Sequence, residues 1–452
     1  MINRKAYHFL SDFFSNDKRA LLVTGARQVG KTFAIRTIGK ELFEHIVEIN
    51  FIEQPNAVEM FRSPQSAKDL LMRISAFTRR KLVPGQTLIF FDEIQECEEI
   101  VTAIKFLVDE GSYRYVMSGS LLGVELKDLR SVPVGYLGEL EMYPLDLEEF
   151  SKALGISDEV ISHLKECYDK KIPVDEFVHQ KMLEVVMLYM IVGGMPAAVQ
   201  KYLDTNNLRV VLNEQRDIIR TYKRDITKYD KGRKLQIEEI YNLIPSELNA
   251  KNKRFILKEL KEKARLVRYE SGFLWLKDTG VAIPAYNVET PQMPLLLNKQ
   301  RNLFKLFLND VGLLAAMYGG DIQVRLLSKT NVNYGAAFEN LVAQELYAHG
   351  FAIDHDLFYF NSKKQGELDF VVEYQGEVLP LEVKSGKDFE RHRALSNIMD
   401  NDEYSIPKAF VFCQDNVQTK NRLVYLPIYM LMFFQHDSNE DLTFHINLTG
   451  LK

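Results

Sequence analysis

Hydrophobic and polar positions follow one pattern over the first half of the chain. Up to about residue 146, short runs of β-branched, aliphatic and aromatic residues alternate with helical stretches; these runs are ALLVTG, HIVEINF, TLIFFDE and YRYVMSGS. Strands that alternate with helices are typical of a parallel sheet covered by helices. Residues 146–228 show helical spacing alone, interrupted by the turn GGMP at 193–196. We therefore expect residues 1–230 to form an α/β domain with a helical lid.

Two further patterns follow. Residues 231–325 contain two helical stretches and then a short aromatic run at 272–277, which predicts a strand within a small winged-helix unit and a connecting segment. Residues 326–452 begin with a helix around GAAFENLVAQELYAHG and continue with strands, which predicts a second α/β domain. The Pro-containing stretch 287–300 is the candidate linker.

Length and composition limit the class of protein. The 452 residues exceed what one hydrophobic core usually organises, so we expect two to four domains. A chain that is 46% hydrophobic and 26% charged is typical of a soluble globular protein. The formal net charge of −5 excludes a uniformly basic nucleic-acid-binding surface, so any contact with nucleic acid must be regional.

Apolar segments and cysteine spacing bear on localisation and on the redox state of the thiols. The N-terminus has no sustained apolar segment and the chain has no long apolar run, which predicts a cytoplasmic protein with no membrane partner. Cys97, Cys167 and Cys413 lie far apart, which predicts reduced thiols in the core. The nine His show no metal-ligand spacing such as HExxH.

Residues 25–32, GARQVGKT, fit the phosphate-binding loop G-x-x-x-x-G-K-[ST] between a strand and a helix. Gly25 and Gly30 would let backbone N–H groups face the phosphates of ATP at the helix N-terminus. Lys31 would neutralise the β- and γ-phosphates, and the Thr32 hydroxyl would bind Mg²⁺. The alternative is a chance Gly-rich turn.

The run LIFFDE at 88–93 supplies the second half of such a site. Asp92 would hold Mg²⁺ directly or through water, and Glu93 would polarise the attacking water. The alternative for both residues is a solvated strand end. The segment Ser118–Ser120, which ends another strand-like run, is either a sensor of the γ-phosphate or a simple turn.

The C-terminal stretch 366–387, GELDFVVEYQGEVLPLEVKSGK, carries a different chemistry. Asp369 on one strand, with Glu382 and Lys384 on one face of the next, resembles the core of PD-(D/E)xK nucleases. In that reading Asp369 and Glu382 bind Mg²⁺, Lys384 orients or activates water, and Glu339 adds the helical glutamate found in many such enzymes. The alternative is a domain that keeps this fold without activity, with Glu382 and Lys384 forming a salt bridge.

A basic segment lies in the middle of the chain. Residues 251–268, KNKRFILKELKEKARLVR, hold eight Lys or Arg and two Glu, with apolar residues at helical spacing. As a recognition helix, this segment would contact DNA through Lys258, Lys261 and Arg265. The alternative is a packing module with a solvated basic face.

The loop, LIFFDEIQE, YVMSGS, MYPLDLEEF (142–150) and GGMPAAV (193–199) together resemble the AAA-type ATPases of the archaeal-ATPase group. The resemblance implies a P-loop NTPase sheet with a helical lid, a winged-helix middle segment and a C-terminal restriction-endonuclease-like α/β domain. It also implies ATP and Mg²⁺ as cofactors, DNA as a partner, and leaves room for a homo-oligomer.

One position departs from the pattern of these ATPases. Relatives usually carry a Gly-Arg pair before the YPL motif, and this chain has Gly135 and Tyr136 there. Arg130, Arg220 or Arg224 would have to serve as an arginine finger, or each is a surface charge.

Two functions remain open from the sequence. The chain is either an ATPase coupled to a metal-dependent nuclease that acts on DNA, or an ATP-switched regulator whose nuclease-like domain only binds nucleic acid or protein.

Overall fold

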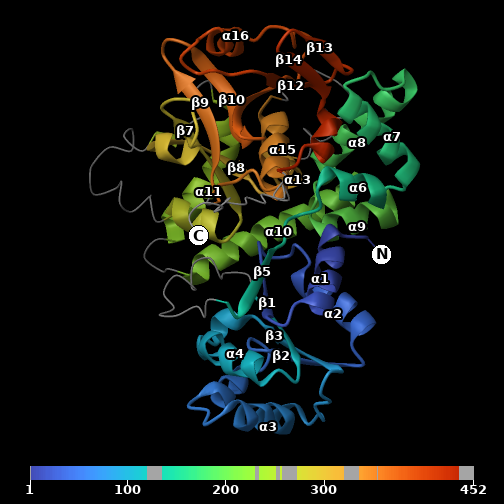
Figure 1. The fold of residues 1–452 in the computed structure, drawn as a ribbon, viewed down its shortest axis with the longest axis vertical. Helices are drawn as coiled ribbons and strands as arrows, with labels where there is room; N and C mark the ends of the chain where they lie inside the picture. Colours follow the sequence, from blue (N-terminus) through green and yellow to red (C-terminus); the bar gives the residue numbers. More distant parts are fainter. Residues whose placement is uncertain are drawn as a thin grey trace, which may run out of the picture.

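The computed structural model describes residues 2–119, 135–229, 234–250, 255–256, 272–319, 335–353 and 355–436. Within these ranges the strands form one five-stranded and one nine-stranded sheet. The long helix α10 (Leu208–Tyr229) lies across the middle of the molecule, with the smaller sheet on one side and the larger sheet on the other (Figure 1).

The five-stranded sheet is parallel and has the order β2-β3-β4-β1-β5. Its strands are β1 (Ala20–Thr24), β2 (His45–Asn50), β3 (Thr87–Asp92), β4 (Arg114–Ser118) and β5 (Leu137–Glu141). Because β4 lies between β1 and β3, the carboxyl ends of these three strands meet at one edge. That edge is where open α/β sheets bind their ligands.

Both faces of this sheet are buried, as the alternation along its strands requires. Leu21 and Val23 of β1 pack into the core that contains α1 (Lys5–Asn16) and α2 (Lys31–Leu42). Leu22 faces the opposite core, which contains α3 (Ala67–Thr78) and α4 (Glu99–Glu110). The predicted parallel sheet covered by helices is confirmed.

A run of helices follows the small sheet, as predicted for residues 146–228. These are α6 (Leu147–Ala153), α7 (Asp158–Lys170), α8 (Glu176–Val192), α9 (Pro196–Thr205) and α10; α11 (Lys234–Asn249) comes next. The turn between α8 and α9 contains Gly194, where a Cβ would lie 2.0 Å from the carbonyl oxygen of Leu145. Only glycine allows this approach, which holds the lid helices against the segment that leaves the sheet.

The nine-stranded sheet has the order β13-β14-β12-β11-β10-β9-β7-β8-β6. Its strands are β6 (Phe255–Ile256), β7 (Ala282–Val288), β8 (Lys299–Leu308), β9 (Leu357–Ser362), β10 (Gly366–Tyr374), β11 (Glu377–Val383), β12 (Ala409–Cys413), β13 (Gln418–Lys420) and β14 (Leu423–Pro427). The short 3-10 helices η4 (Leu295–Asn298) and η5 (Ile428–Phe433) and the helices α13 (Val311–Tyr318), α15 (Gly335–Ala348) and α16 (Arg393–Met399) accompany it.

This sheet crosses the boundary expected at residues 325–326. Strands β7 and β8 belong to the predicted middle segment, yet β7 pairs in parallel with β9 of the C-terminal part. The reason is burial on both faces: β7 is apolar along most of its length, so a connecting segment that exposed it would be costly. The stretch 287–300, expected as a linker, instead joins β7 to β8 within the sheet.

The strand predicted at 272–277 is wrong, because residues 272–278 are helical. Phe273 and Leu276, three residues apart, are buried, whereas Leu274 is 44% exposed. The helix ends at Gly280, whose φ of +68° allows the Val281 N–H to donate back to the carbonyl of Leu276 at 3.1 Å.

Cys97, Cys167 and Cys413 are buried free thiols, as predicted. Among the described residues, no helix by itself has the length and apolar character needed to cross a bilayer. Helices α8 and α9 reach that length only together, and a bend of 119° separates them.

Candidate functional site

The loop between β1 and α2 has the backbone geometry of a phosphate-binding loop. Gly25, Gln28 and Gly30 all have positive φ values, of 118°, 68° and 97°. A Cβ on Gly25 would lie 2.1 Å from the carbonyl oxygen of Met142, so the loop can pass beside β5 only with glycine there. Gly30 directly precedes α2, so the first N–H groups of that helix are available to an anion.

Lys31 lies at the centre of this loop. It is buried, and its Nζ donates to the carbonyl oxygens of Gly25 and Ala26, each at 2.9 Å. Burial lowers the pKa of Lys31 to about 8, against the opposing charges of Glu93 and Asp92. A triphosphate would supply the negative charge that the buried ammonium group lacks here.

Asp92 ends β3 beside the loop and gathers polar side chains from neighbouring strands. Its Oδ2 accepts hydrogen bonds from Thr32 Oγ1 and Asn50 Nδ2, each at 3.2 Å, and its Oδ1 accepts one from the Ser118 hydroxyl. A hydroxyl and a carboxylate side by side are oxygen ligands that suit Mg²⁺. The predicted pair Thr32 and Asp92 is therefore brought together, and Ser118 joins it, while Ser120 lies outside the described residues.

Glu93 occupies a special backbone position. It has a φ of +57°, and its Oε2 accepts a hydrogen bond of 2.6 Å from Gln95 Nε2. This conformation turns the chain sharply after β3 and leaves the carboxylate at the wall of the cavity beside the loop.

That cavity has a volume of about 480 Å³, a size that suits a nucleotide. Its polar wall includes Lys31, Thr32, Asp92 and Glu93. Other lining residues come from the N-terminal segment, the segment that follows β5 and the lid; these include Ile2, Tyr7, Met142, Leu145, Pro196 and Ala197. The apolar side chains among these offer a surface for a base, so one cavity combines a phosphate end and an apolar end.

Arg4 is a residue of this site that the sequence did not reveal. It is only 6% exposed and donates to the carbonyls of Val29, at 3.1 Å, and Tyr143, at 2.7 Å. Its Nε also pairs with Glu149 at 3.1 Å. Arg4 therefore links the loop to the segment that follows β5 through hydrogen bonds, a role that no local sequence motif predicts.

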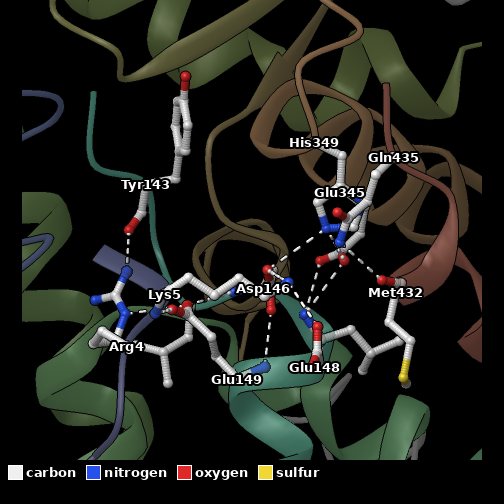
Figure 2. A network of polar contacts seen from close by, with 12 residues as sticks. Arg4, Lys5, Tyr143, Asp146, Glu148, Glu149, Glu345, His349, Met432 and Gln435 are labelled. Carbon is white, nitrogen blue, oxygen red and sulfur yellow. Dashed lines mark hydrogen bonds and ion pairs between the residues drawn. The ribbon is translucent and has the colours of Figure 1, made fainter. Parts of the chain in front are cut away.

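Beyond the cavity, a buried polar network joins this segment to α15 (Figure 2). Asp146 caps α6, and His349 Nε2 lies 3.5 Å from its Oδ2 and 3.7 Å from Glu345 Oε2. The Leu147 N–H donates to Glu345 Oε1 at 3.1 Å, while Lys5 pairs with Asp146 at 2.7 Å.

Burial and neighbouring charges shift the pKa values of Glu345 and His349 in this network. Burial raises the pKa of Glu345 to about 7, although His349 opposes that shift. Burial alone would lower the pKa of His349, but Asp146 and Glu345 raise it above its usual value. The contacts thus place titratable groups from distant parts of the sequence around one buried position: Asp146, Glu345 of α15, and His349 directly after α15.

The four C-terminal residues predicted as a nuclease-like set also come together. Lys384 Nζ contacts Glu382 Oε1 at 2.6 Å, and Asp369 Oδ2 accepts a hydrogen bond from the Val383 N–H at 2.8 Å. Burial and the neighbouring Asp369 raise the pKa of Glu382 to about 8, against Lys384. Glu339 on α15 lies near enough to contribute to this shift. The salt bridge considered from the sequence is present.

Lys305 adds a component that the sequence analysis missed. This lysine of β8 is fully buried, and its Nζ lies 2.8 Å from Glu367 Oε1 and 3.7 Å from Glu339 Oε2. Although burial disfavours its charge, Glu339 and Glu367 raise its pKa above the usual value. A lysine within the apolar run LFKLFL was the available signal.

The negative charges of Glu339, Glu367 and Glu382 are thus balanced by the two lysines Lys305 and Lys384. Within the described residues, no group of three or more His, Cys, Asp or Glu side chains is placed to hold a metal ion. In this arrangement Lys305 and Lys384 supply positive charge beside Glu339 and Glu382.

Several predicted residues are not part of either site. Lys258, Lys261, Arg265 and Arg130 lie outside the described residues, so the recognition helix and one candidate finger have no structural account. Arg220 pairs with Asp217 at 2.7 Å on the exposed face of α10, and Arg224 is also exposed. Neither lines the nucleotide cavity, whereas Arg4 and Arg27 do.

Solved structures similar to this chain have low identity. The RuvB Holliday junction branch migration motor of Thermotoga maritima is 18% identical, with 65% of this chain and 91% of that chain covered and a TM-score of 0.31. The Aeropyrum pernix Orc1 protein in complex with DNA is 14% identical, with 72% and 93% covered and a TM-score of 0.26. C. elegans PCH-2 is 16% identical, with 46% of this chain and 65% of that chain covered and a TM-score of 0.26.

Family models match three stretches of the chain, while no curated protein matches it. Residues 184–323 and 334–431 match two domains of unknown function, DUF8612 and DUF4143, which establish neither a winged helix nor a PD-(D/E)xK fold. Residues 17–151 match the model described as AAA domain. This stretch contains the glycine loop, Lys31, Thr32 and the Asp92–Glu93 strand end, and it is an AAA-type P-loop ATPase domain.

Proposed function

We propose that the protein binds and hydrolyses ATP at the P-loop and passes its nucleotide state to a DNA-binding C-terminal part. One observation carries this proposal: a series of hydrogen bonds links the nucleotide cavity to the corner that follows β8 of the nine-stranded sheet. Leu145 and Pro196 line the cavity, and the Leu145 N–H donates to the Gly194 carbonyl at 2.7 Å. The Gly194 N–H in turn donates to Asp310 Oδ2 at 2.6 Å.

In the proposed reaction each residue has a separate task. Lys31 and the backbone from Gly25 to Gly30 would bind the phosphates, and Thr32 and Asp92 would hold Mg²⁺. The bound ion would neutralise charge on the phosphate oxygens. Glu93 would orient the attacking water, because its carboxylate faces the cavity from the strand end.

Two substitutions test the proposed ATP site. Lys31→Ala should abolish ATP binding in calorimetry, since the loop loses its buried positive charge. Glu93→Gln should keep ATP affinity and slow hydrolysis, by about 100-fold or more if the carboxylate acts as a base. Equal ATP affinity for wild type and Lys31→Ala, or unchanged turnover in Glu93→Gln, contradicts the respective assignment.

For the C-terminal part, we propose that regulation rather than cleavage is the primary role. Lys305 and Lys384 already lie against Glu339 and Glu382, two of the carboxylates that a nuclease would offer to metal. DNA would be bound through the basic segment 251–268, with Lys258, Lys261 and Arg265 on phosphates. Replacing these three residues with Ala should weaken DNA binding and reduce its salt dependence; an unchanged salt slope would point to a protein partner instead.

Metal-dependent DNA cleavage is the second candidate, and one atom favours it. Glu382 Oε2 is buried and has no hydrogen-bond partner among the described residues, so this carboxylate keeps an unused acceptor. Purified protein should be incubated with plasmid, single-stranded and branched DNA, with Mg²⁺ or Mn²⁺ and with or without ATP. Cleavage that Asp369→Ala, Glu382→Ala and Lys384→Ala each abolish, while ATPase activity survives, would establish this candidate. Absence of cleavage on every DNA form leaves the regulatory role.

A further inference from the structure

A second cavity, of about 610 Å³, lies between α10, α11 and α13. It shares no lining residue with the nucleotide cavity. Its volume falls in the range of small-molecule and cofactor sites. The residues that line it are Arg216, Ile219, Arg220, Lys223, Asn242, Pro245, Ser246, Asn249, Ala316, Met317 and Tyr318.

The charge of this lining is entirely positive. Arg216, Arg220 and Lys223 recur at helical spacing on one face of α10, and no Asp or Glu lines the cavity. Arg220 shares its charge with Asp217 at 2.7 Å, a pair in which both side chains are about two-thirds exposed. Within the described residues, Arg216 and Lys223 make no ion pair. In a chain of net charge −5, this is a local concentration of uncompensated positive charge.

The wall opposite the basic side chains is polar and neutral. Asn242, Ser246 and Asn249 recur at the same spacing on α11. Ser246 Oγ donates to the Leu243 carbonyl at 2.8 Å and Asn249 Nδ2 to the Pro245 carbonyl at 2.9 Å, so the Asn242 amide and the second N–H of the Asn249 amide are the donors left for a ligand. The Tyr318 hydroxyl at the end of α13 is buried and lies close to Asn249 of this wall. Cations on one side and neutral donors on the other are the groups that bind phosphate oxygens.

We propose that this cavity is a binding site for a phosphate-bearing anion, separate from the ATP site. Arg216 and Lys223 would pair with the phosphate oxygens, and the α11 amides and Tyr318 would complete their hydrogen bonds. The phosphate can belong to a free nucleotide-like molecule or to the backbone of a nucleic acid, which share this chemistry. The site goes beyond the proposed ATP hydrolysis and does not depend on it.

The same helix connects this site to the P-loop. On the opposite face of α10, the Tyr222 hydroxyl donates to the Arg27 carbonyl at 3.0 Å, and Asp225 pairs with Arg27 at 2.5 Å. Arg27 belongs to the loop that would bind ATP. An anion on one face of α10 therefore lies one helix diameter from a contact on the phosphate-binding loop.

The test uses the Lys31→Ala protein, so that phosphate probes do not report on the P-loop. Inorganic pyrophosphate is titrated by calorimetry, and a short labelled oligothymidylate by fluorescence anisotropy. The double variant Arg216→Gln/Lys223→Gln is compared with Arg209→Gln/Lys18→Gln, which removes the same charge from exposed positions outside the cavity. All four positions are on the surface or partly exposed, so folding is checked by the melting temperature of each variant.

The cavity variant should bind at least one probe about tenfold more weakly, whereas the control should match its parent. Loss for pyrophosphate alone identifies a small phosphorylated ligand, and loss for the oligonucleotide alone identifies a nucleic-acid backbone; either supports the site. Binding of neither probe, or equal weakening in the cavity and control variants, overturns it.

Discussion

The carboxylate of Asp310 accepts a hydrogen bond of 2.6 Å from the Gly194 N–H, and so joins the strand-to-helix corner after β8 to the turn of the lid. The same carboxylate caps α13 through the Leu313 N–H at 2.8 Å. Burial raises the pKa of Asp310 to about 6, although these backbone donors favour its charged form. A Cβ on Gly193 would collide with this carboxylate, which explains why the turn begins with glycine.

The first prediction concerns this carboxylate. Asp310→Ala should destabilise the protein by about 2–5 kcal/mol, since buried N–H groups lose their acceptor. It should also weaken ATP binding, because the turn borders the cavity. The control is Asp175→Ala, which removes an exposed cap of α8 and should cost only about 1 kcal/mol. Denaturant unfolding and calorimetry with ATP measure both effects; equal losses in the two variants would contradict a special role for Asp310.

A second prediction tests the loop geometry. Gly25→Ala should abolish ATP binding, because the new Cβ would lie 2.1 Å from the Met142 carbonyl oxygen at a φ of +118°. Gly85→Ala is the matched control, since Gly85 also has a positive φ, of 74°, but meets no atom within 4 Å. Gly85→Ala should therefore lower stability slightly through backbone strain and leave ATP affinity unchanged. ATP binding by Gly25→Ala at wild-type affinity would rule out the close approach.

The third prediction is a pH dependence of stability. Glu345 has a folded pKa of about 7 against an ordinary value of 4.5, so between these values only the folded chain holds this proton. Its contribution to stability must fall as pH rises through that window. The pKa of His349 is also raised, so its contribution is lost in the same direction. Asp146 has a lowered pKa and acts only at more acidic pH.

Melting temperatures between about pH 5 and pH 8 measure this dependence. Glu345→Gln keeps an acceptor for the Leu147 N–H and should flatten the fall seen in the wild type. Glu184→Gln, on the exposed side of α8, should leave the slope as it is. A wild-type melting temperature that rises across this range would show that the network titrates in the opposite sense.

The fourth prediction addresses Lys305. Lys305→Met should destabilise the protein by about 3–5 kcal/mol, because Glu339 and Glu367 lose a buried counterion. Lys420→Met breaks the exposed pair with Glu390 and should cost about 1 kcal/mol or less. Added Mn²⁺ should raise the melting temperature of Lys305→Met more than that of the wild type, since the cluster then lacks positive charge. No difference between the two lysine variants would exclude internal compensation by Lys305.

The sequence was sufficient where the chemistry is local. The P-loop residues lie within eight positions, and the strand that ends in Asp92 has an unmistakable apolar run, so Lys31, Thr32 and Asp92 could be placed in advance. The carboxylates on β10 and β11 could also be paired, because two-residue periodicity and a short hairpin fix their side of the sheet.

The sequence was insufficient where the site depends on contacts between residues that lie far apart along the chain. Leu147 and Glu345 are 198 residues apart, and neither has a motif that points to the other. Lys305 is defined by acidic side chains on α15 and β10, so its role appears only when the strands are assembled. The run at 272–277 was misassigned because a short apolar stretch fits strand and helix equally well, and tertiary packing of Phe273 and Leu276 decides.

The parallel pairing of β7 with β9 bears on how the protein can be divided for experiments. A fragment that begins at residue 326 would leave β7 and β8 behind and turn β9 into an open edge. Buried aromatic residues of β9, among them Phe358 and Phe360, would then border unpaired backbone groups, a combination that promotes aggregation. A C-terminal fragment expressed for DNA-binding assays should therefore start before Lys251, so that it keeps the basic segment 251–268 as well as the strands that pair beside β9.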